Sequence, residues 1–573
     1  MWCKKCNKIS YNEVCEICGE KTQIDIPTEI FWCEHCQIPL IKELSIEGDF
    51  CCPICGASAH YLSKDLRPVF PEERLLLELL ENKPFAYIDK SVWAVDSRYY
   101  INGKSTSLSI DNLKKVDVDS IKEQLDNYAS KNTYQYFDAY IDLFVRANLE
   151  RLAIIKEEAF KFVQEQTQLY PHHKLVVSFS GGKDSTVVAD IVTRALSNPS
   201  IVHIFGDTTL EFPSTYDYVA RFRKNNPKTI VRTSKNREQN FYSVCEQIGP
   251  PARMMRWCCT MFKTGPITRT LNSLFRDSKI LTFYGIRKYE SVARSKYERV
   301  ANGANVKIQK QTVAAPIFNW NDLEVWLYML GEQVDFNDAY RLGYDRVGCW
   351  CCPNNTIRSQ LLAKIYMPEQ SRKWREYLIS FAKSIGKPDP EVYVDDGKWK
   401  ARQGGNGLEA AEDVKIKFTN CTAEEHAKIY KLNKEITDDF YNLFVPFGKV
   451  SRELGRKMLH EVLVLDLATN VPILSIQPFS QEDYIFAVKI RTLNVADHEN
   501  LQRMVSYQIR KYNACKRCLK CESVCSFDAI SVSNARYYID ENKCKHCKKC
   551  VTAKYLEGGC LMDRFLRSKE EKQ

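Results

Sequence analysis

Hydrophobic and polar positions change period several times along the chain, and each period predicts a different element. PEERLLLELLEN has the spacing of an amphipathic helix, whereas FAYIDKSVWAV and RYYINGKS alternate as short strands do. We therefore expect a small α+β module over residues 63–135. A longer amphipathic run from about Tyr140 to Gln168 predicts one helix, which Pro171 ends.

From Lys174 onward, buried-strand runs alternate with helical stretches. KLVVSFS, IVHIFGD, KTIVRT and KILTFYGI are strand patterns, and STVVADIVTRAL is a helix pattern. Helical-length intervals between strands act as crossover connections, which make the strands parallel. We therefore predict an α/β fold with a parallel sheet core over residues 136–400.

The stretch RQGGNG, from Arg402 to Gly407, predicts a flexible loop or a domain boundary. Beyond it we expect Thr422 to cap a polar helix, and HEVLVLDLAT, PILSIQPF and YIFAVKIRTL to form strands. Residues 411–510 would thus be a further α+β segment, in which no catalytic motif is recognisable.

Composition and charge narrow the class of protein. With 44% hydrophobic and 27% charged residues in 573, the chain is an ordinary globular protein rather than a disordered one or a coiled coil. No apolar run is long enough for a membrane span and no signal segment precedes MWCKKC, so we expect a cytoplasmic protein without a membrane partner. The net charge is +10, and the basic tail from Lys511 suits an acidic partner.

The 24 cysteines change the picture most, because they are bunched. Four CxxC pairs in residues 1–62 can form two quartets, and four thiolates from two tight turns close a tetrahedral metal site that folds a module without a large core. We expect one Zn²⁺ in each quartet, with iron as the alternative, and favour Cys52 over Cys51 because Pro and Gly form the turn around it. The predicted ligands are Cys3, Cys6, Cys15 and Cys18, then Cys33, Cys36, Cys52 and Cys55.

Residues 511–573 carry another bunch of cysteines that resembles the bacterial two-cluster ferredoxins. In that pattern the fourth cysteine of each run ligates the other cluster, so Cys525 would join the second run. Cys560, after a spacer of 9 residues, would complete the first, although Ser526 stands where the family usually has Pro. We expect two [4Fe–4S] clusters, with one cluster plus a zinc as the alternative. The two ligand sets are Cys515, Cys518, Cys521 and Cys560, and Cys525, Cys544, Cys547 and Cys550.

A glycine-containing loop joins the first strand of the core to its helix. Glycines let the backbone approach a phosphate, a helix N-terminus attracts it, and a lysine adds a point charge. The loop resembles the pyrophosphatase (PP) loop of the adenine-nucleotide α-hydrolase superfamily and lacks the GxxxxGK[ST] spacing of Walker NTPases. The predicted nucleotide-binding residues are Ser180, Gly181, Gly182, Lys183, Asp184 and Ser185.

With that loop, residues 138–358 resemble the phosphoadenosine phosphosulfate reductase family. DTTLEFP from Asp207, GIRKYESVAR from Gly285 and PIFNWNDLEVWLY from Pro316 are similar to its motifs. The resemblance implies a Rossmann-like PP-loop fold, with an adenine nucleotide over the carboxyl ends of the strands and Asp207 among the residues that bind it.

Two cysteine knots, WCCTMFK and GCWCCPN, complete the resemblance. Adenylylsulfate reductases of this family use two adjacent cysteines and a distant CxxC to bind one [4Fe–4S] cluster. The ligands implied here are Cys258, Cys259, Cys349 and Cys352. Cys351 is left over, as an inert packed thiol or a reactive one.

The function that the resemblance favours is an iron–sulfur enzyme of sulfur transfer. It would cleave Mg-ATP to AMP and pyrophosphate, activate an acceptor, for which a nucleic acid is one candidate, and use a sulfur or electron donor as partner. Lys183 and Asp184 of the loop are the expected catalytic residues, with Lys263 and Arg287 as charge clamps.

Two alternatives remain from the sequence. A sulfonucleotide reductase would make sulfite with electrons from the ferredoxin-like tail, but the Glu-Cys-Gly-Leu-His segment of those enzymes does not occur here. Cys421 would have to replace its nucleophile, although a structural thiol is the simpler interpretation. The second alternative is a non-catalytic nucleotide and iron–sulfur sensor.

Overall fold

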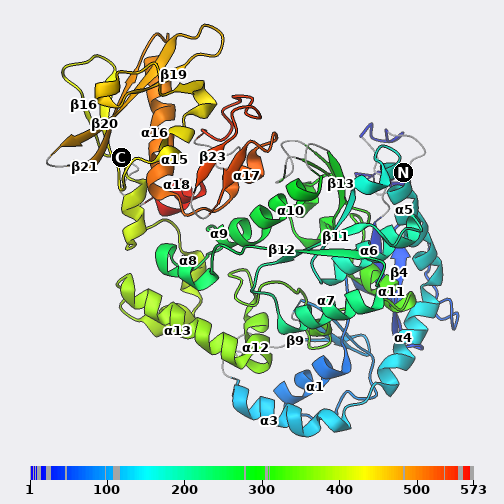
Figure 1. Ribbon diagram of the computed structural model, residues 1–573. Helices are drawn as coiled ribbons and strands as arrows, with labels where there is room; N and C mark the ends of the chain where they lie inside the picture. Colours follow the sequence, from blue (N-terminus) through cyan, green and yellow to red (C-terminus); the bar gives the residue numbers. More distant parts are fainter. Residues whose placement is uncertain are drawn as a thin grey trace.

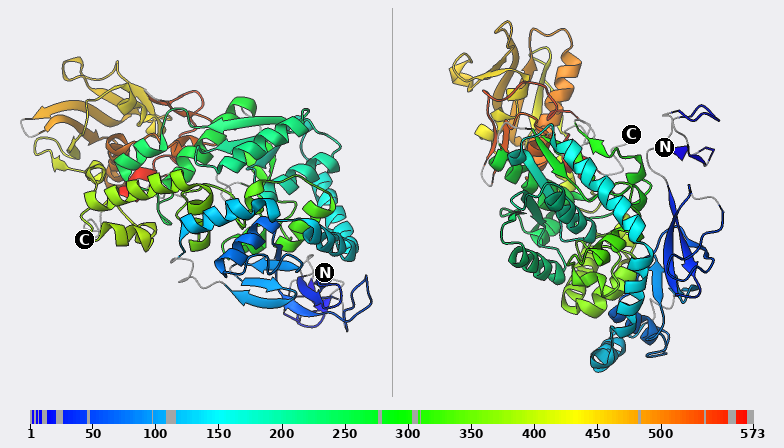
Figure 2. Two further views of the ribbon diagram at one scale, coloured as in Figure 1. Left: turned by 90° about the horizontal axis from the view of Figure 1, so that it is seen from below. Right: turned by 90° about the vertical axis from the view of Figure 1, so that its right-hand side faces the viewer.

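The computed structural model describes residues 2–567 apart from 4, 7, 10–13, 21–26, 46–47, 97, 108–115, 276–278, 303–307, 309, 482–483, 534–535 and 553–558. The N-terminal strands and the C-terminal antiparallel sheet lie at opposite ends of the molecule, with the parallel sheet between them (Figure 1; Figure 2). Within the described part of the chain, no helix combines the length and apolarity needed to cross a bilayer.

Two small antiparallel sheets form the N-terminal end. β1 (Trp2–Cys3) pairs with β2 (Lys8–Ile9), and the second sheet has the order β4-β3-β5. Its strands are β3 (Thr28–Cys33), β4 (Ile38–Glu43) and β5 (His60–Ser63). Cys3 and Cys6 lie at the end of β1 and in the turn after it, and Cys33 and Cys36 lie in the same way at the turn between β3 and β4.

The residues of the predicted α+β module form a four-stranded meander and helices. The meander consists of β6 (Arg67–Pro68), β7 (Val92–Val95), β8 (Arg98–Ile101) and β9 (Lys104–Ser107), and α1 (Pro71–Leu80) lies between its first two strands. α3 (Val118–Tyr128) leads to α4 (Gln135–Ala147) and α5 (Leu149–Thr167).

The single helix expected from Tyr140 to Gln168 is therefore two helices. They part at Asn148, whose side chain accepts from the backbone N–H of Ile41 at 2.8 Å and donates to the carbonyl of Pro39 at 3.1 Å. These bonds tie the start of α5 to β4, so a tertiary contact interrupts a run that is continuous in the sequence.

The parallel sheet of the core has the order β12-β11-β10-β13-β15-β14, and only β14 is antiparallel. The strands are β10 (Leu175–Phe179), β11 (Val202–Asp207), β12 (Ile230–Lys235), β13 (Ile280–Phe283), β14 (Val300–Ala301) and β15 (Gln311–Ala314). The helices between and after them are α6 (Lys183–Ala195), α7 (Pro213–Asn225), α8 (Phe241–Ile248), α9 (Trp257–Cys259), α10 (Gly265–Phe275) and α11 (Asp322–Gly331). The predicted α/β class with a parallel sheet is confirmed.

One hydrophobic cluster runs from the second N-terminal sheet through α4 and α5 into β10, α6 and α11. Residues on both sides of the predicted domain boundaries at 62 and 135 thus share one hydrophobic core. Figure 2 shows the N-terminal strands beside the helices that cover the parallel sheet.

After the core come α12 (Ile357–Tyr366), α13 (Pro368–Ser384) and α14 (Pro390–Asp395). A six-stranded antiparallel sheet then has the order β16-β17-β21-β20-β19-β18. Its strands are β16 (Phe418–Asn420), β17 (Ala427–Lys431), β18 (Lys449–Ser451), β19 (Val462–Leu465), β20 (Pro472–Gln481) and β21 (Tyr484–Thr492), with α15 (Asp438–Asn442) in between. The helix predicted after Thr422 is wrong, because residues 427–431 pair with β21 instead.

The cysteine-rich C-terminal segment begins at the end of α16 (His498–Ala514). It contains α17 (Lys520–Val524), a hairpin of β22 (Ile530–Val532) and β23 (Tyr537–Ile539), and α18 (Leu561–Leu566). This segment docks on α10 of the core, where Arg269 forms ion pairs with Glu238 and Glu522.

Candidate nucleotide and metal sites

The glycine loop lies between the carboxyl end of β10 and the first turn of α6. Gly182 caps the helix, and Gly181 has a φ of +73°, a left-handed conformation that glycine adopts without strain. The Ser185 hydroxyl donates to the Gly182 carbonyl at 2.8 Å and accepts from the Ser180 N–H at 3.1 Å. The loop is therefore held in shape by its own polar groups, with the helix N-terminus at its centre.

Two further segments close around this loop. The backbone N–H of Lys183 donates to the Tyr340 hydroxyl at 2.9 Å. A Cβ on Gly285 would lie 2.6 Å from the carbonyl carbon of Asp184, so the GIRKYES segment approaches the loop as closely as only glycine permits. The motif that follows β13 thus borders the nucleotide loop.

Four charged side chains form a closed network beside the loop. Lys183 Nζ lies 3.3 Å from a carboxylate oxygen of Asp184 and 3.0 Å from Asp322 Oδ1. Arg287 contacts the same two carboxylates, with Nε 2.6 Å from Asp184 and Nη2 2.7 Å from Asp322. Two cations thus meet two anions, and Lys183 and Arg287 are 5% and 3% exposed.

Burial and charge oppose each other in this network. Burial would lower the pKa of Lys183, but the carboxylates of Asp184 and Asp322 outweigh it and raise that pKa above its usual value. Burial would likewise raise the pKa of Asp184, yet Arg287 and Lys183 hold it well below the ordinary range. Lys183 and Asp184 are therefore both charged at neutral pH.

The DTTLEFP segment connects this edge of the sheet to the cysteine knots. Asp207, at the end of β11, accepts from the Thr209 N–H at 2.8 Å and the Tyr216 hydroxyl at 2.9 Å. Glu211 forms an isolated β-bridge with Cys349, and the Trp350 N–H donates to the Leu210 carbonyl at 3.0 Å. The segment brings the second knot to the end of β11.

The first knot occupies the short α9 and continues into a π-helical turn over Thr260–Thr264. π-Helical turns are rare in proteins as a whole, and those that occur are frequently found at functional sites. A hydrogen bond with Cys259 raises the pKa of Cys258, and Cys349 adds to it; Cys259 also acts on Cys352. The two knots are therefore close enough to interact electrostatically, although 89 residues separate them in sequence, and their sharing of one cluster stays a prediction.

Three exposed cations surround the knots: Lys263, Arg256 and Arg346. Lys263 acts electrostatically on Glu211 and Cys349, and both arginines act on Cys352. Among the described residues, none of the three forms an ion pair. Lys263 thus lies at the cysteine knots, whereas Arg287 lies at the nucleotide loop.

Four cysteines lie outside the predicted ligand sets, and one of them, Cys351, is 5% exposed and packs in the hydrophobic cluster that contains Trp257. Burial raises the pKa of its thiol well above the usual value, which leaves it protonated. Cys421 lies between β16 and β17 of the antiparallel sheet, on a different element from the knots.

The C-terminal cysteines fall into two neighbouring groups. Cys518 is close enough to Cys560, Cys521 and Cys515 for each to raise its pKa, after burial as the main cause. Cys544 is affected in the same way by Cys525 and Cys547. The two ligand sets taken from the ferredoxin pattern stay a prediction, since Cys550 acts electrostatically with both Cys521 and Cys525.

The N-terminal quartets are tighter. In each, all four Sγ atoms lie within 4.8 Å of one another, and Cys52 rather than Cys51 belongs to the second. Sγ–Sγ distances are 3.4 Å for Cys3–Cys18 and 3.5 Å for Cys33–Cys55. A zinc–sulfur bond of 2.3 Å in a tetrahedron places the sulfurs about 3.8 Å apart, so each quartet fits a single ion.

Two residues of the nucleotide loop's surroundings were not expected from the sequence, namely Asp322 and Tyr340. Asp322 follows Asn321, whose side chain forms a capping box with Glu324 at the start of α11. The N-D-L-E pattern is a signal for a helix start, but its position beside Lys183 depends on the fold.

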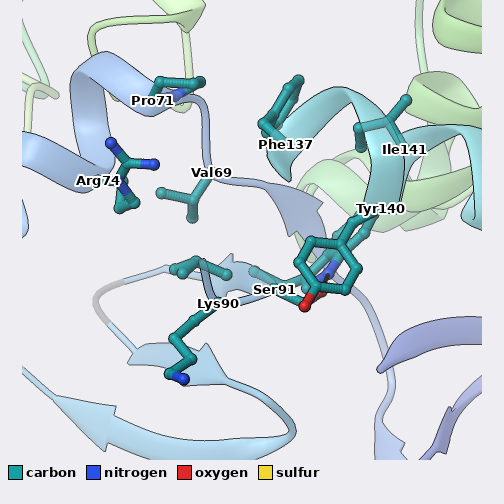
Figure 3. Close-up of a pocket in the computed structure, with 10 residues that line it drawn as sticks. Val69, Pro71, Arg74, Lys90, Ser91, Phe137, Tyr140 and Ile141 are labelled. Atoms are coloured by element: carbon teal, nitrogen blue, oxygen red, sulfur yellow. Dashed lines mark hydrogen bonds between the residues drawn. The ribbon is translucent and has the colours of Figure 1, made fainter. Parts of the chain in front are cut away.

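A separate small pocket lies between α1, β7 and α4 (Figure 3). Val69, Arg74, Ser91, Phe137 and Tyr140 are among the residues that line it. Its volume of about 20 Å³ suits one water molecule, which is far too small for a nucleotide.

Comparisons with known proteins agree with the family resemblance that the sequence motifs of the parallel-sheet core indicate. Residues 174–355 match the family model described as the phosphoadenosine phosphosulfate reductase domain. An uncharacterized protein of Methanocaldococcus jannaschii is 32% identical over 300 residues, which cover 52% of this chain and 60% of the relative. The chain thus spans about 60% of the length of that relative.

An adenosine 5'-phosphosulfate reductase of Staphylococcus epidermidis is 24% identical over 207 residues, covering 35% of this chain and 79% of the relative. Among solved structures, a phosphoadenylyl-sulfate reductase from Candida auris in complex with phosphate aligns with a TM-score of 0.27 and 18% identity. That alignment covers 35% of this chain and 96% of the other. The family match itself rests on residues 174–355, and cysteine-rich segments lie on both sides of that phosphoadenosine phosphosulfate reductase domain match.

Proposed function

We propose that this chain is an ATP-cleaving enzyme of sulfur transfer, which releases pyrophosphate and forms an adenylylated acceptor. The observation that carries the proposal is the intact glycine loop at the N-terminus of α6, with the buried, charged Lys183 beside it. A β,γ-pyrophosphate presents the anion that such a loop binds, whereas adenylylsulfate has no pyrophosphate.

The charge balance of the network supports a divalent cation as the companion of ATP. Lys183 and Arg287 already neutralise Asp184 and Asp322. A polyphosphate must therefore displace a carboxylate or bring its own cation, and Mg²⁺ neutralises a departing pyrophosphate. Lys183 and the first N–H groups of α6 would hold the leaving group.

In the reaction, an acceptor oxygen attacks the α-phosphorus and the bond between the α- and β-phosphates breaks. Pyrophosphate leaves with its magnesium. A sulfur nucleophile then attacks the acceptor atom that carries the adenylylated oxygen and displaces AMP together with that oxygen. A nucleic acid suits the acceptor role because the chain carries a net charge of +10 and exposed arginines beside the knots.

The neighbouring cysteines fit an iron–sulfur cluster as resident cofactor. Cys258, Cys259, Cys349 and Cys352 would hold it at the carboxyl edge of the sheet, where a bound cluster would supply one-electron chemistry. Lys263 would offset part of the thiolate charge. The two C-terminal groups of cysteines fit two more clusters, and the two N-terminal quartets fit one Zn²⁺ each.

A second candidate function is a sulfonucleotide reductase. The adenosine 5'-phosphosulfate reductase similar to this domain favours it, as do the knots themselves. Its weakness is the nucleophile, since burial keeps Cys351 protonated and Cys421 lies in another sheet.

The test is a product analysis under anaerobic conditions with iron-replete protein. One arm contains Mg-ATP; the others contain adenylylsulfate or phosphoadenylylsulfate with a low-potential reductant. We expect AMP and pyrophosphate from ATP, with tRNA and DNA as the first acceptors to add. Sulfite from a sulfonucleotide, with no cleavage of ATP, would reverse the order of the two candidates.

A further inference from the structure

The second N-terminal cysteine module, defined here as residues 28–65, meets the nucleotide domain at the first turn of α11. Asn321, which caps that helix, donates from Nδ2 to Thr28 Oγ1 at 3.0 Å. Glu43 of the module pairs with Arg151, whose Nε donates to Glu324 of α11 at 2.8 Å. Both contacts fix the end of the helix that faces the nucleotide loop.

Asp65 makes the most direct of these contacts. Its carboxylate accepts from the backbone N–H of Asp322 at 3.0 Å, of Leu323 at 3.1 Å and of Leu66 at 2.8 Å. The first N–H groups of a helix have no partner within it and attract negative charge. A carboxylate more than 250 residues away in sequence therefore serves as a second cap of α11.

The residue that Asp65 holds is the one that pairs with the phosphate loop. Asp322 gives its backbone N–H to Asp65 and its carboxylate to Lys183 and Arg287. A shift of the first turn of α11 would thus move the counter-charge of Lys183. Among the described residues, Asp65 forms no hydrogen bond or ion pair with the loop at 180–185; it contacts Asp322 and acts electrostatically on Arg287.

The two N-terminal quartets differ in this respect. Cys33 and Cys52 belong to the hydrophobic cluster that also contains Phe179 of β10 and Val187 of α6. Cys3 and Cys15 are buried, but within the described ranges they belong to none of the hydrophobic clusters. The second quartet therefore lies within the hydrophobic core of the nucleotide domain, whereas the first quartet lies outside it.

We propose that the second module supports the nucleotide site. Asp65 is then a positioning residue, which holds Asp322 where its carboxylate contacts Lys183. Metal binding at Cys33, Cys36, Cys52 and Cys55 then sets the affinity for the β- and γ-phosphates of ATP. The inference rests on the proposed function, because it assumes that the loop binds those phosphates.

The first experiment compares binding of Mg-ATP and AMP by calorimetry in wild type, Asp65→Ala, Asp65→Asn and Asp49→Ala. Asp49 is an exposed aspartate of the same module and serves as the matched control. Asp65→Ala should weaken Mg-ATP about tenfold, or about 1.4 kcal/mol, and leave AMP within twofold. Asp65→Asn should restore most of the affinity, because Oδ1 accepts from Leu66, Asp322 and Leu323 and only the second bond from Asp322, to Oδ2, is lost.

The second experiment removes one metal from each module. Cys6→Ser and Cys36→Ser should each lose one zinc by elemental analysis, but only Cys36→Ser should lose the preference for Mg-ATP over AMP. Equal behaviour of the two variants would overturn the inference, as would an unchanged preference in Asp65→Ala. A wild type that binds Mg-ATP no more tightly than AMP would instead overturn the proposed function, and the inference with it.

Discussion

The carboxyl edge of the parallel sheet has two halves with opposite charge arrangements. At the nucleotide loop, Lys183 and Arg287 are buried and paired with two carboxylates. At the cysteine knots, Lys263, Arg256 and Arg346 are exposed and form no ion pair within the described part of the chain. β11 and the loop that follows it connect the two halves.

The difference shows how one edge can serve two kinds of anion. Buried ion pairs fix the positions of the loop's charges before a ligand arrives, and removing one partner leaves the other uncompensated. The exposed cations are free to balance thiolates or an incoming polyanion. We therefore expect the two halves to fail independently when each is changed.

The largest effect should come from Lys183→Ala. Turnover of ATP should fall about 10³-fold or more, since the variant loses the charge on the leaving group and strands two carboxylates. Iron content should stay at the wild-type value, measured on the same preparation. Unchanged turnover would remove the loop from the mechanism.

Cys259→Ser changes the other half. The variant should lose about four irons of the total, because one [4Fe–4S] cluster needs all four ligands. Its affinity for Mg-ATP, measured by calorimetry, should stay within a few-fold of wild type. A constant iron content would show that the central ligand set is wrongly assigned, and a parallel loss of ATP binding would show that the halves are coupled.

β11, the strand that joins the two halves, should make the stability of the fold depend on pH. Burial lowers the pKa of His203 in β11 to about 4, so the folded state binds a proton less readily than the unfolded state. Stability contributed by the neutral ring is present above pH 6.5 and is lost as pH falls toward 4, by about 3 kcal/mol.

Hydrogen exchange of the β10 and β11 amides at pH 7 and pH 5 would measure this local loss. His203→Leu should flatten the pH dependence in these strands and leave that of the distant β20 and β21 unchanged. A variant with the wild-type pH dependence would locate the acid-sensitive group elsewhere.

The smallest effect concerns the exposed cations. Lys263→Ala should slow turnover about tenfold, without a change in iron content or in the affinity for AMP. Lys228→Ala changes an exposed lysine in the loop before β12; it is the control and should behave as wild type. A loss of iron in Lys263→Ala would assign this lysine to cluster stability instead.

Much of the fold is readable from local patterns. The buried runs of β10, β11 and β13 and the glycine loop after β10 follow from periodicity and turn chemistry. The quartets follow from CxxC spacing, because the ligands of one ion come from adjacent turns. These signals lie within a few residues of one another.

What could not be read depends on contacts distant in sequence. Asp65 caps α11 across 257 positions, and Asn148 divides a helical run because it binds β4. Residues 427–431 form a strand because β21 pairs with them, against a helical pattern. In each case the partner, rather than the local sequence, decides the outcome.

The most direct test of the central claim is the hydrolysis of Mg-ATP in ¹⁸O-labelled water by the anaerobic, iron-replete protein without an added acceptor. Water then replaces the acceptor, and attack at the α-phosphorus places the label in AMP with unlabelled pyrophosphate. We predict that result, abolished in Lys183→Ala. Label in inorganic phosphate, with ADP as the other product, would contradict the account.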